Sequence, residues 1–459
     1  MTAGNLNRGD TTGSNPLLLF AAFPGEGHTN PLLSIASYLV KTGYEVVFMA
    51  PDLYQTKVEE TGAEYLRVDN PLTGEVMQSF REATSLPRGL ERVAGQYKAV
   101  FLDMLPMRTQ STEDALVMLQ ARDPSRQIIF MEDVFNSTLL PFKYGRPLPE
   151  GLSSMPRSIG FGVAPLLFES RDNAPMSLGL LPDSTVSGRQ RNEALHKLAE
   201  SGPFRNMIES WQGALRKLGC TVIPDGKMFS CLYTAHDYAL QLCSPSLEYP
   251  LSDLPSSIEY AGLLPRKSVK PGFEYPPWWP EVERKRESKY RHVVFVSQGT
   301  LNPNYTDLIL PSLNAFVERQ DVLVVATLGA RGTKLPSEIV VPSNARVVDY
   351  IPYDIILEYT DVFISNAGYG TFTHAVSNGV PVVLAGENEE KIEVTMRAIY
   401  AGIGLSLETQ TPTAEQVRKG VQKVLSDSQY KKAAVKLKME NENLDSVSLI
   451  EDKIRKLIA

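Results

Sequence analysis

Small and hydroxyl-bearing residues follow a short apolar run at residues 361–365 and could bind a phosphate. The segment reads Asn366-Ala-Gly-Tyr-Gly-Thr371 and precedes a helix expected at residues 372–378. Because Gly368 and Gly370 carry no Cβ, a ligand can approach the backbone closely there. The N–H groups at the start of a helix also favour an anion. The sequence therefore predicts phosphate binding at this corner, with a simple tight strand-to-helix turn as the alternative.

A histidine, His28, lies at a comparable place in the first half of the chain. Residues 17–23 form a predicted buried strand, and a helix is expected to begin at Pro31 with Asn30 as its N-cap. A second strand at residues 45–50 completes a β-α-β unit. Such sheets bind ligands at the carboxyl ends of their strands. His28 is thus a candidate catalytic residue, and a capping or otherwise satisfied polar residue is the alternative.

The loop around His28 also partly matches the dinucleotide-binding pattern G-x-G-x-x-G. Gly25 and Gly27 occupy the first two positions, and Asp52 follows the second strand. The third glycine is replaced by Asn30, which is followed by proline. Because the third glycine normally provides close helix–strand packing, the match to this pattern is incomplete.

The second half of the chain resembles the nucleotide-sugar signature of family 1 glycosyltransferases, the UDP-glycosyltransferase group. In that family a tryptophan stacks on uracil, and a His-Gly-Gly-type turn with a Ser or Thr holds the diphosphate. An acid then binds the ribose, and an Asp-Gln pair binds the sugar. The residues at these places here are Tyr350, the turn Asn366 to Thr371, His374, and the pair Glu390-Lys391. The pair is similar to one found in a bacterial and fungal branch of the family.

The resemblance extends to the first half of the chain. Gly27-His28-Thr-Asn-Pro31 matches the family's first loop, Gly-His-x-x-Pro, whose histidine is the catalytic base. The family also places a carboxylate after a later strand to orient that histidine. Here a predicted strand at residues 127–131 is followed by Glu132 and Asp133. Asp133 is our choice and Glu132 the alternate, while capping of a helix expected at residues 135–142 is a competing role.

The resemblance implies a glycosyltransferase B fold, with a UDP-sugar in the second domain and an acceptor in the first. It implies a single inverting displacement from the UDP-sugar co-substrate, most simply UDP-glucose, to a hydroxyl of a small hydrophobic, phenolic or other natural-product acceptor. The donor-binding residues expected are Gly27, Gly299, Thr300, Tyr350, Ile351, Asn366, Gly368, Gly370, Thr371, His374, Glu390 and Lys391. Apolar residues that suggest an acceptor cleft are Phe80, Met104, Phe135, Phe142 and Phe168. No Asp-x-Asp element follows a strand in the second half, so we expect no metal or other cofactor.

Alternating strands and helices predict an α/β protein with two doubly wound parallel-sheet domains, since 459 residues are many for one core. Within the first domain, residues 160–168 read as a strand, and residues 189–218 as one long helical region with Leu198 on its packed face. The expected segments are a disordered N-terminus at 1–15, an acceptor-binding domain at 16–264, a linker at 265–290, a donor-binding domain at 291–430, and a C-terminal helix at 431–459. In the family such a tail returns to the first domain.

Composition excludes several other classes of protein. The net charge of −7 provides no basic surface for nucleic acid or an anionic membrane. No apolar run approaches the ~20 residues needed for a membrane span. Cys220, Cys231 and Cys243 lack metal-ligand spacing and fit a reduced, cytoplasmic setting. We expect a monomer or a weak dimer.

Two alternative functions remain at this point. One is a nucleotide-sugar isomerase on the same fold. Such an enzyme would need no hydrophobic acceptor cleft, whereas the apolar residues of the first half suggest that a cleft is present. A non-catalytic binding subunit of a membrane glycosyltransferase could dispense with His28, and it would usually carry an apolar membrane-facing patch or an anchor.

Overall fold

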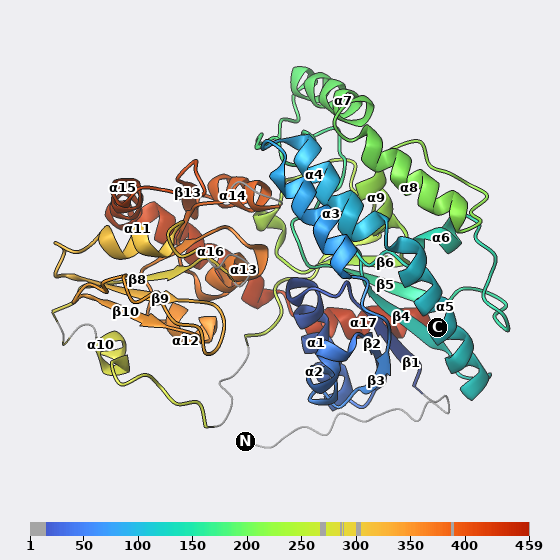
Figure 1. Cartoon of the computed structure of the whole chain (residues 1–459). Coiled ribbons are helices and arrows are strands. Elements are labelled where there is room, and N and C mark those ends of the chain that lie inside the picture. The colour runs from blue at the N-terminus through green and yellow to red at the C-terminus, as the bar shows by residue number, and fades with distance from the viewer. Residues whose placement is uncertain are drawn as a thin grey trace.

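The structure, a computed structural model, describes residues 15–266, 272–284, 287, 289–299, 304–386 and 390–458. Two parallel sheets with helices packed on them lie side by side (Figure 1). This arrangement confirms the predicted α/β architecture of two parallel-sheet domains. Most of the expected N-terminal lead-in, and parts of the expected linker, lie outside the described residues.

The first sheet contains β1 (Leu17–Ala21), β2 (Glu45–Ala50), β3 (Glu64–Arg67), β4 (Ile128–Asp133), β5 (Arg157–Gly162), β6 (Tyr238–Gln241) and β7 (Ile258–Tyr260). Their order in the sheet is β3-β2-β1-β4-β5-β6-β7, and every pairing is parallel. Along β1, Leu18 and Phe20 belong to one hydrophobic core, whereas Leu17 and Leu19 belong to another. Both faces of the sheet are therefore covered, which explains why its strands are apolar throughout.

The helices of the first domain cover these two faces. They are α1 (Glu26–Lys41), α2 (Gln55–Glu59), α3 (Gly74–Ser85), α4 (Leu90–Tyr97), α5 (Leu105–Arg122), α6 (Leu140–Lys143), α7 (Val186–Ser201), α8 (Arg205–Lys217) and α9 (Met228–Thr234). Short single turns lie at Asp52–Tyr54, Lys98–Leu102 and Pro245–Leu247.

The second sheet contains β8 (His292–Ser297), β9 (Val322–Thr327), β10 (Ala345–Val348), β11 (Val362–Ser365), β12 (Val382–Leu384) and β13 (Gly404–Ser406). Their order is β10-β9-β8-β11-β12-β13. The remaining helices are α10 (Trp279–Glu283), α11 (Ile309–Asn314), α12 (Tyr353–Leu357), α13 (Tyr369–Asn378), α14 (Lys391–Tyr400), α15 (Ala414–Ser426), α16 (Ser428–Asn443) and α17 (Ser446–Ile458).

Each sheet has one place where the strand order reverses direction. In the first sheet this place lies between β1 and β4, whose ends pair at Ala21 and Glu132. In the second sheet it lies between β8 and β11, which pair at Ser297 and Ser365. Loops that leave neighbouring strands in opposite directions open a crevice there, and ligands of such folds bind in it.

The end of the chain crosses from the second domain to the first. Helix α16 packs against α13, and its Leu437 belongs to a core of the second domain. Helix α17 then packs on the first domain, where Ile450 and Ile454 join the core that contains Leu18. The single C-terminal helix expected at 431–459 is therefore two helices, and together α16 and α17 tie the two domains to each other (Figure 1). In the part of the chain that the structure describes, no helix has the length and apolar character needed to cross a bilayer.

Helix α1 begins earlier than predicted. It starts at Glu26 with Gly25 as its N-cap, so His28 lies in the first helical turn and Pro31 lies inside the helix. The amides of His28 and Thr29 both donate to the Gly25 carbonyl. Proline removes only the bond that residue 31 would give to the carbonyl of Gly27, which is exposed and open to water.

The segment expected as a helix at residues 135–142 was predicted wrongly. It is mostly a turn, and only α6 at its end is helical. Ser137 adopts a left-handed backbone conformation with φ of 54°. The carboxylate of Glu132 accepts both the amide and the hydroxyl of Thr138, which gives the backbone an alternative to helical hydrogen bonds.

Two other predicted elements have different bounds. Strand β5 ends at Gly162, because the amides of Leu166 and Leu167 donate to side chains of Glu248 and Tyr233 instead of a neighbouring strand. The long helical region at residues 189–218 is two helices, α7 and α8, separated at Gly202, which is followed by a proline. Leu198, expected on the packed face, is exposed.

Candidate active site

His28 and Asp133 meet at the carboxyl edge of the first sheet. The Nδ1 atom of His28 lies 2.7 Å from Oδ2 of Asp133, whose side chain is fully buried. The Asp133 carboxylate also accepts the amide of Phe135 at 3.1 Å and that of Phe23 at 3.4 Å. The carboxylate is thus fixed in place, and it holds the imidazole by one ring nitrogen. The other nitrogen, Nε2, remains for a substrate, and 22% of the His28 side chain is exposed.

The surroundings raise the pKa of His28 above its ordinary value of 6.5. Burial alone would lower this pKa, but the charge of Asp133 and its hydrogen bond outweigh burial. Glu390 of the second domain raises the pKa further, and Arg108 opposes it. An imidazole whose protonated form is stabilised in this way is suited to accept a proton from a substrate.

Glu132, the alternate carboxylate, faces away from His28. Neighbouring residues on a strand point to opposite faces of the sheet. The Glu132 carboxylate accepts the side-chain amide of Asn136 at 3.0 Å, together with two bonds from Thr138. Burial, only partly offset by the bonds from Thr138, raises the pKa of Glu132 to about 7. This residue shapes the loop after β4, and Asp133 is the carboxylate that contacts the histidine.

Aromatic rings surround His28. The ring centres of Phe23, Phe135 and Phe101 lie 5.3, 5.5 and 6.0 Å from the imidazole. Tyr97 lies 5.1 Å from Phe101. Of this wall only Phe135 was predicted from the sequence. Phe23 ends a run that reads as a buried strand, and Tyr97 and Phe101 lie where the apolar pattern gave no clear element, so no local signal pointed to them.

The other predicted acceptor residues are spread over the first domain. Phe168 is buried in the same core as Phe135, and Phe80 and Met104 are half-buried on α3 and at the start of α5. Phe142 is not among the rings that contact His28 in the described part of the chain. It lies on α6, on the side of the first domain away from the second (Figure 1), with the guanidinium of Arg146 5.6 Å from its ring.

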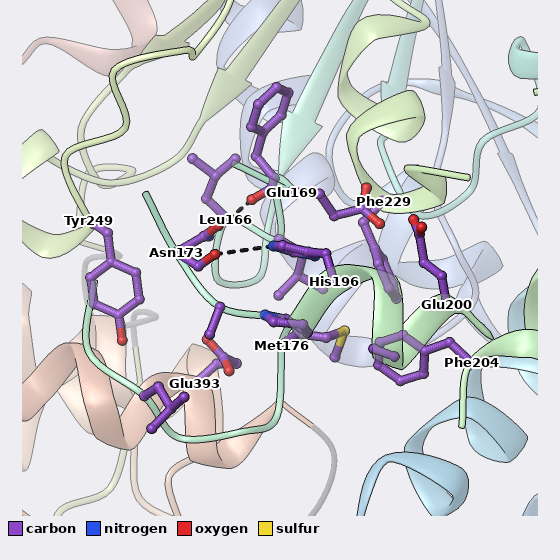
Figure 2. Close-up of a pocket in the computed structure, with 16 residues that line it drawn as sticks. Leu166, Glu169, Asn173, Met176, His196, Glu200, Phe204, Phe229, Tyr249 and Glu393 are labelled. Atoms are coloured by element: carbon purple, nitrogen blue, oxygen red, sulfur yellow. Dashed lines mark hydrogen bonds between the residues drawn. The ribbon is translucent and has the colours of Figure 1, made fainter. Parts of the chain in front are cut away.

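Phe168 also lines a pocket between the loop after β5, helix α7 and the second domain (Figure 2). In this view Tyr249 and Glu393 lie on the side opposite Phe204. Phe229, another lining residue, contacts Tyr97 edge-on at 5.3 Å. The aromatic wall at His28 is therefore connected by packing to this pocket.

In the second domain, the turn from β11 into α13 has an unusual backbone. Ala367 is left-handed, with φ of 63°, whereas Gly368 and Gly370 have ordinary conformations. The side-chain amide of Asn366 donates to the Gln298 carbonyl and ties the end of β11 to that of β8, while its Oδ1 is buried and has no hydrogen-bond partner among the described residues. A Cβ on Gly370 would have no atom of the described residues within 4 Å. Open space therefore lies beside the first turn of α13.

Hydroxyl groups line the same turn. The Thr371 hydroxyl donates to the Gly368 carbonyl at 2.8 Å and lies 3.1 Å from the hydroxyl of Ser365. The first amides of a helix have no partners within the helix and carry a partial positive charge. Open space, amides and hydroxyls together can accommodate a diphosphate. Gly299, left-handed with φ of 75°, lies beside Asn366, and Thr300 lies outside the described residues.

The remaining residues that we predicted to bind the donor lie on the same side of the second domain. Tyr350 is partly exposed, and the guanidinium of Arg331 lies 4.4 Å from its ring centre. The side chain of Ile351 is buried in the core, so only its backbone is available to a nucleotide. His374 stacks on Tyr353 at 5.4 Å, and its Nδ1 lies 2.8 Å from Asp354. Asp354, which no sequence motif marks, therefore orients His374.

Glu390 and Lys391 form the start of helix α14, with Glu390 at the N-cap position. Gly27 lies in the first turn of α1, where a Cβ would meet no atom within 4 Å among the residues that the structure describes. The carboxyl edges of the two sheets face each other, because Gln241 at the end of β6 donates to the hydroxyl of Tyr369, the first residue of α13, at 3.5 Å. The expected donor residues thus lie across from His28.

Comparisons with known proteins agree with this geometry. Residues 312–451 match the family model described as Erythromycin biosynthesis protein CIII-like, C-terminal domain. UDP-glucosyltransferase 1 of Beauveria bassiana is 34% identical over 449 residues, which cover 97% of this chain and 96% of that protein. UDP-glucosyltransferase A1 of Starmerella bombicola is 33% identical over 451 residues, covering 96% and 92%.

Solved structures show the same fold. The crystal structure of the glycotransferase of kitacinnamycin superposes with a TM-score of 0.68 at 18% identity, covering 96% of this chain and 99% of that one. The full-length similarity to curated relatives extends this likeness from fold to family. The chain therefore belongs to the family 1 UDP-glycosyltransferases, enzymes of the glycosyltransferase B fold that use UDP-sugars as donors.

Proposed function

We propose that the protein transfers glucose from UDP-glucose to a hydroxyl group of a small hydrophobic acceptor, with inversion at the anomeric carbon. The observation that carries this proposal is the His28–Asp133 pair, which lies across the domain boundary from the first turn of α13. The names of the relatives support glucose as the sugar.

In this mechanism His28 is the general base. Its Nε2 takes the proton of the acceptor hydroxyl while that oxygen attacks the anomeric carbon and the bond from this carbon to the diphosphate breaks. Asp133 holds Nδ1, and its charge stabilises the imidazolium that forms. A single displacement from an α-linked donor gives a β-glycoside.

The leaving diphosphate gains negative charge during this step. The amides at the start of α13 and the hydroxyls of Ser365 and Thr371 lie where they can stabilise that charge. We propose that this stabilisation requires no metal ion. Thr300 would add a further hydroxyl if it binds as the family resemblance implies.

The rest of the donor would extend along the second domain. Tyr350 is suited to stack on uracil, with the backbone of Ile351 beside it. His374, held by Asp354, presents its other ring nitrogen to the ribose. Glu390 and Lys391, at the start of α14, would bind the sugar hydroxyls.

The rings around His28 support a hydrophobic, planar acceptor such as a phenol or another natural product. Phe101, the half-buried ring of this wall, can pack on an acceptor ring edge-on or offset, so that the acceptor hydroxyl would lie near the imidazole. The buried rings of Phe23 and Phe135 pack against Phe101 and hold it in place. We further propose a cytoplasmic monomer or weak dimer. Free thiols at Cys220, Cys231 and Cys243 support a reducing setting.

Incubation with UDP-glucose, first alone and then with a panel of phenols, tests this function by mass spectrometry of both substrates. We expect UDP-glucose to persist alone, and UDP and a β-glucoside to form once an acceptor is present. Conversion of UDP-glucose into another nucleotide sugar without an acceptor would indicate an isomerase. Binding of UDP with no product from any acceptor would indicate a non-catalytic subunit.

A further inference from the structure

Helix α14 begins with the expected sugar-binding pair and lies on the side of the second domain that faces the first (Figure 1). Ile392 packs on Gly179, where a Cβ would lie 2.8 Å from its Cδ1 atom. The Glu393 carboxylate accepts the amide of Ser177 at 2.7 Å. Both partners belong to the loop that follows β5 in the first domain. The contacts of α14 with the first domain therefore begin at the residues that directly follow Glu390 and Lys391.

Arg397 makes the largest number of hydrogen bonds that we find in this contact. Its side chain is 1% exposed, although it carries a charge. The guanidinium donates to the carboxylate of Glu248 and, at 2.8 Å, to the carbonyl of Leu166, both in the first domain. It also donates to Glu393 at 2.8 Å and lies 4.6 Å from the ring of Tyr249. Every hydrogen bond of this guanidinium to another element thus reaches the first domain.

The network around Arg397 closes on itself. The second carboxylate oxygen of Glu248 accepts the amide of Leu166 at 2.9 Å. Leu166 therefore bonds to Glu248 through its amide and to Arg397 through its carbonyl. An arrangement in which each charged group has several partners permits one relative position of α14 and the first domain.

Stability alone is a weak explanation for such a network. Removing two charges from water costs several kcal/mol per ion, and well-packed apolar replacements of a buried pair are often neutral or stabilising. Uncharged residues could therefore have joined the two domains at least as firmly. The network differs from an apolar contact in that it fixes direction and register.

We propose that Arg397 is a positioning residue for sugar transfer: by bonding to Glu248 and Leu166 it holds the start of α14, with Glu390 and Lys391, against the site of His28. The proposal rests on the proposed function. Glu390 and Arg397 are seven residues apart, close to two helical turns, so they share one face of α14. Glu393 lies between them on that face. The influence of Glu390 on the pKa of His28 is in keeping with this placement.

The test removes all three charges of the network together, so that no buried charge is left without its partner. In the variant Arg397→Met/Glu248→Gln/Glu393→Gln, the glutamine oxygens can still accept the amides of Leu166 and Ser177. The matched control is Arg346→Met/Glu281→Gln, which removes another multiply bonded pair, at 2.7 Å, that does not involve the first domain. Circular dichroism and thermal unfolding establish that both variants fold.

We expect the triple variant to bind UDP within about twofold of the original affinity, because UDP lies on the second domain. Its kcat should fall about 10²-fold, the loss that a misplacement of about 1 Å can cause. The acid limb of its rate profile should move to lower pH, because Glu390 would no longer raise the pKa of His28. The radius of gyration from X-ray scattering should increase. The control variant should retain kcat and the pH profile.

Three results would overturn the proposal. One is a folded triple variant with unchanged kcat and pH profile. The second is a loss of UDP affinity equal to the loss of rate, which would assign the network to the stability of the second domain. The third applies if the original protein transfers no sugar to any acceptor, so that the proposed function itself fails. In that case two measurements that need no activity still test the positioning role: the pKa of His28 by NMR and the X-ray scattering profile, each for the original protein and the triple variant. Identical values in the two proteins would reject the positioning role.

Discussion

The two strand-to-helix corners of the molecule, β1 to α1 and β11 to α13, have the same topology and offer a ligand different groups. At the first corner a side chain is fixed in position, because a buried carboxylate holds His28 and aromatic rings enclose it. At the second corner the backbone conformation leaves the first amides of a helix open to a ligand. Ala367 takes a left-handed conformation there, and open space lies beside the first turn of α13.

This difference teaches how one fold can serve two purposes in one chain. A positioned imidazole changes the rate of a proton transfer, whereas amides at a helix start change how tightly an anion is bound. Substitutions at the first corner should therefore act on turnover, and substitutions at the second should act on UDP affinity.

The largest effect is expected for His28→Ala. Loss of a general base typically lowers the rate by ~10²–10⁴-fold, so kcat with an alcohol acceptor should fall by about that factor. UDP affinity, measured by titration calorimetry, should stay the same, because no donor group has been removed. A parallel loss of UDP affinity would break the distinction between the two corners.

Asp133→Asn should have the next largest effect and should also change the pH dependence. Asp133 raises the pKa of His28, so the amide should let this pKa fall. Since a base must be unprotonated, the acid limb of kcat/KM should move to lower pH, while the plateau rate drops because the imidazolium is no longer stabilised. A pH series in constant ionic strength measures both. An acid limb that stays in place would mean that another group titrates.

Gly370→Ala tests the second corner with a smaller expected effect. The new methyl group would have no atom within 4 Å in the part of the chain that the structure describes, so the variant should fold normally, yet it would occupy the space proposed for the diphosphate. UDP affinity should fall by about tenfold, which corresponds to ~1.4 kcal/mol. Gly213→Ala on α8, which also meets no atom within 4 Å, is the matched control and should leave UDP binding unaltered. Equal UDP affinities of the two variants would show that the diphosphate does not bind in this space.

Treatment with excess EDTA should have the smallest effect. If the amides of α13 and the neighbouring hydroxyls stabilise the leaving diphosphate, the initial rate should not change. The measurement is the rate of UDP release before and after chelation. A loss of rate that added magnesium restores would contradict this expectation.

Much of the fold could be predicted because buried strands have a strong local pattern. Residues 45–50 read as a strand and form β2 with the same bounds. The strand-helix alternation was enough to predict two parallel sheets, since parallel strands need a crossover. The start of α1 was placed too late, because Pro31 suggested a helix start, whereas the N-cap is Gly25, which has no side chain that would mark it as a cap.

The candidate site was predictable only where a motif marks it. His28 and Thr371 stand in recognisable segments, and Asp133 follows a readable strand. Phe101 and Asp354 have no such signal, because their role comes from the side chains that they meet. Arg397 and Glu248 are 149 positions apart in sequence, so their pairing is a property of the tertiary structure alone.

The most direct test of the account is a double-mutant cycle of His28→Ala and Asp133→Asn, measured as kcat with an alcohol acceptor at saturating UDP-glucose. Because a dyad acts as one unit, the double variant should lose much less rate than the product of the two single losses. An acceptor with an already ionised nucleophile, such as an acidic thiol, should partly escape the loss in all three variants. Multiplicative losses, or normal turnover of His28→Ala, would contradict the account and place the base elsewhere.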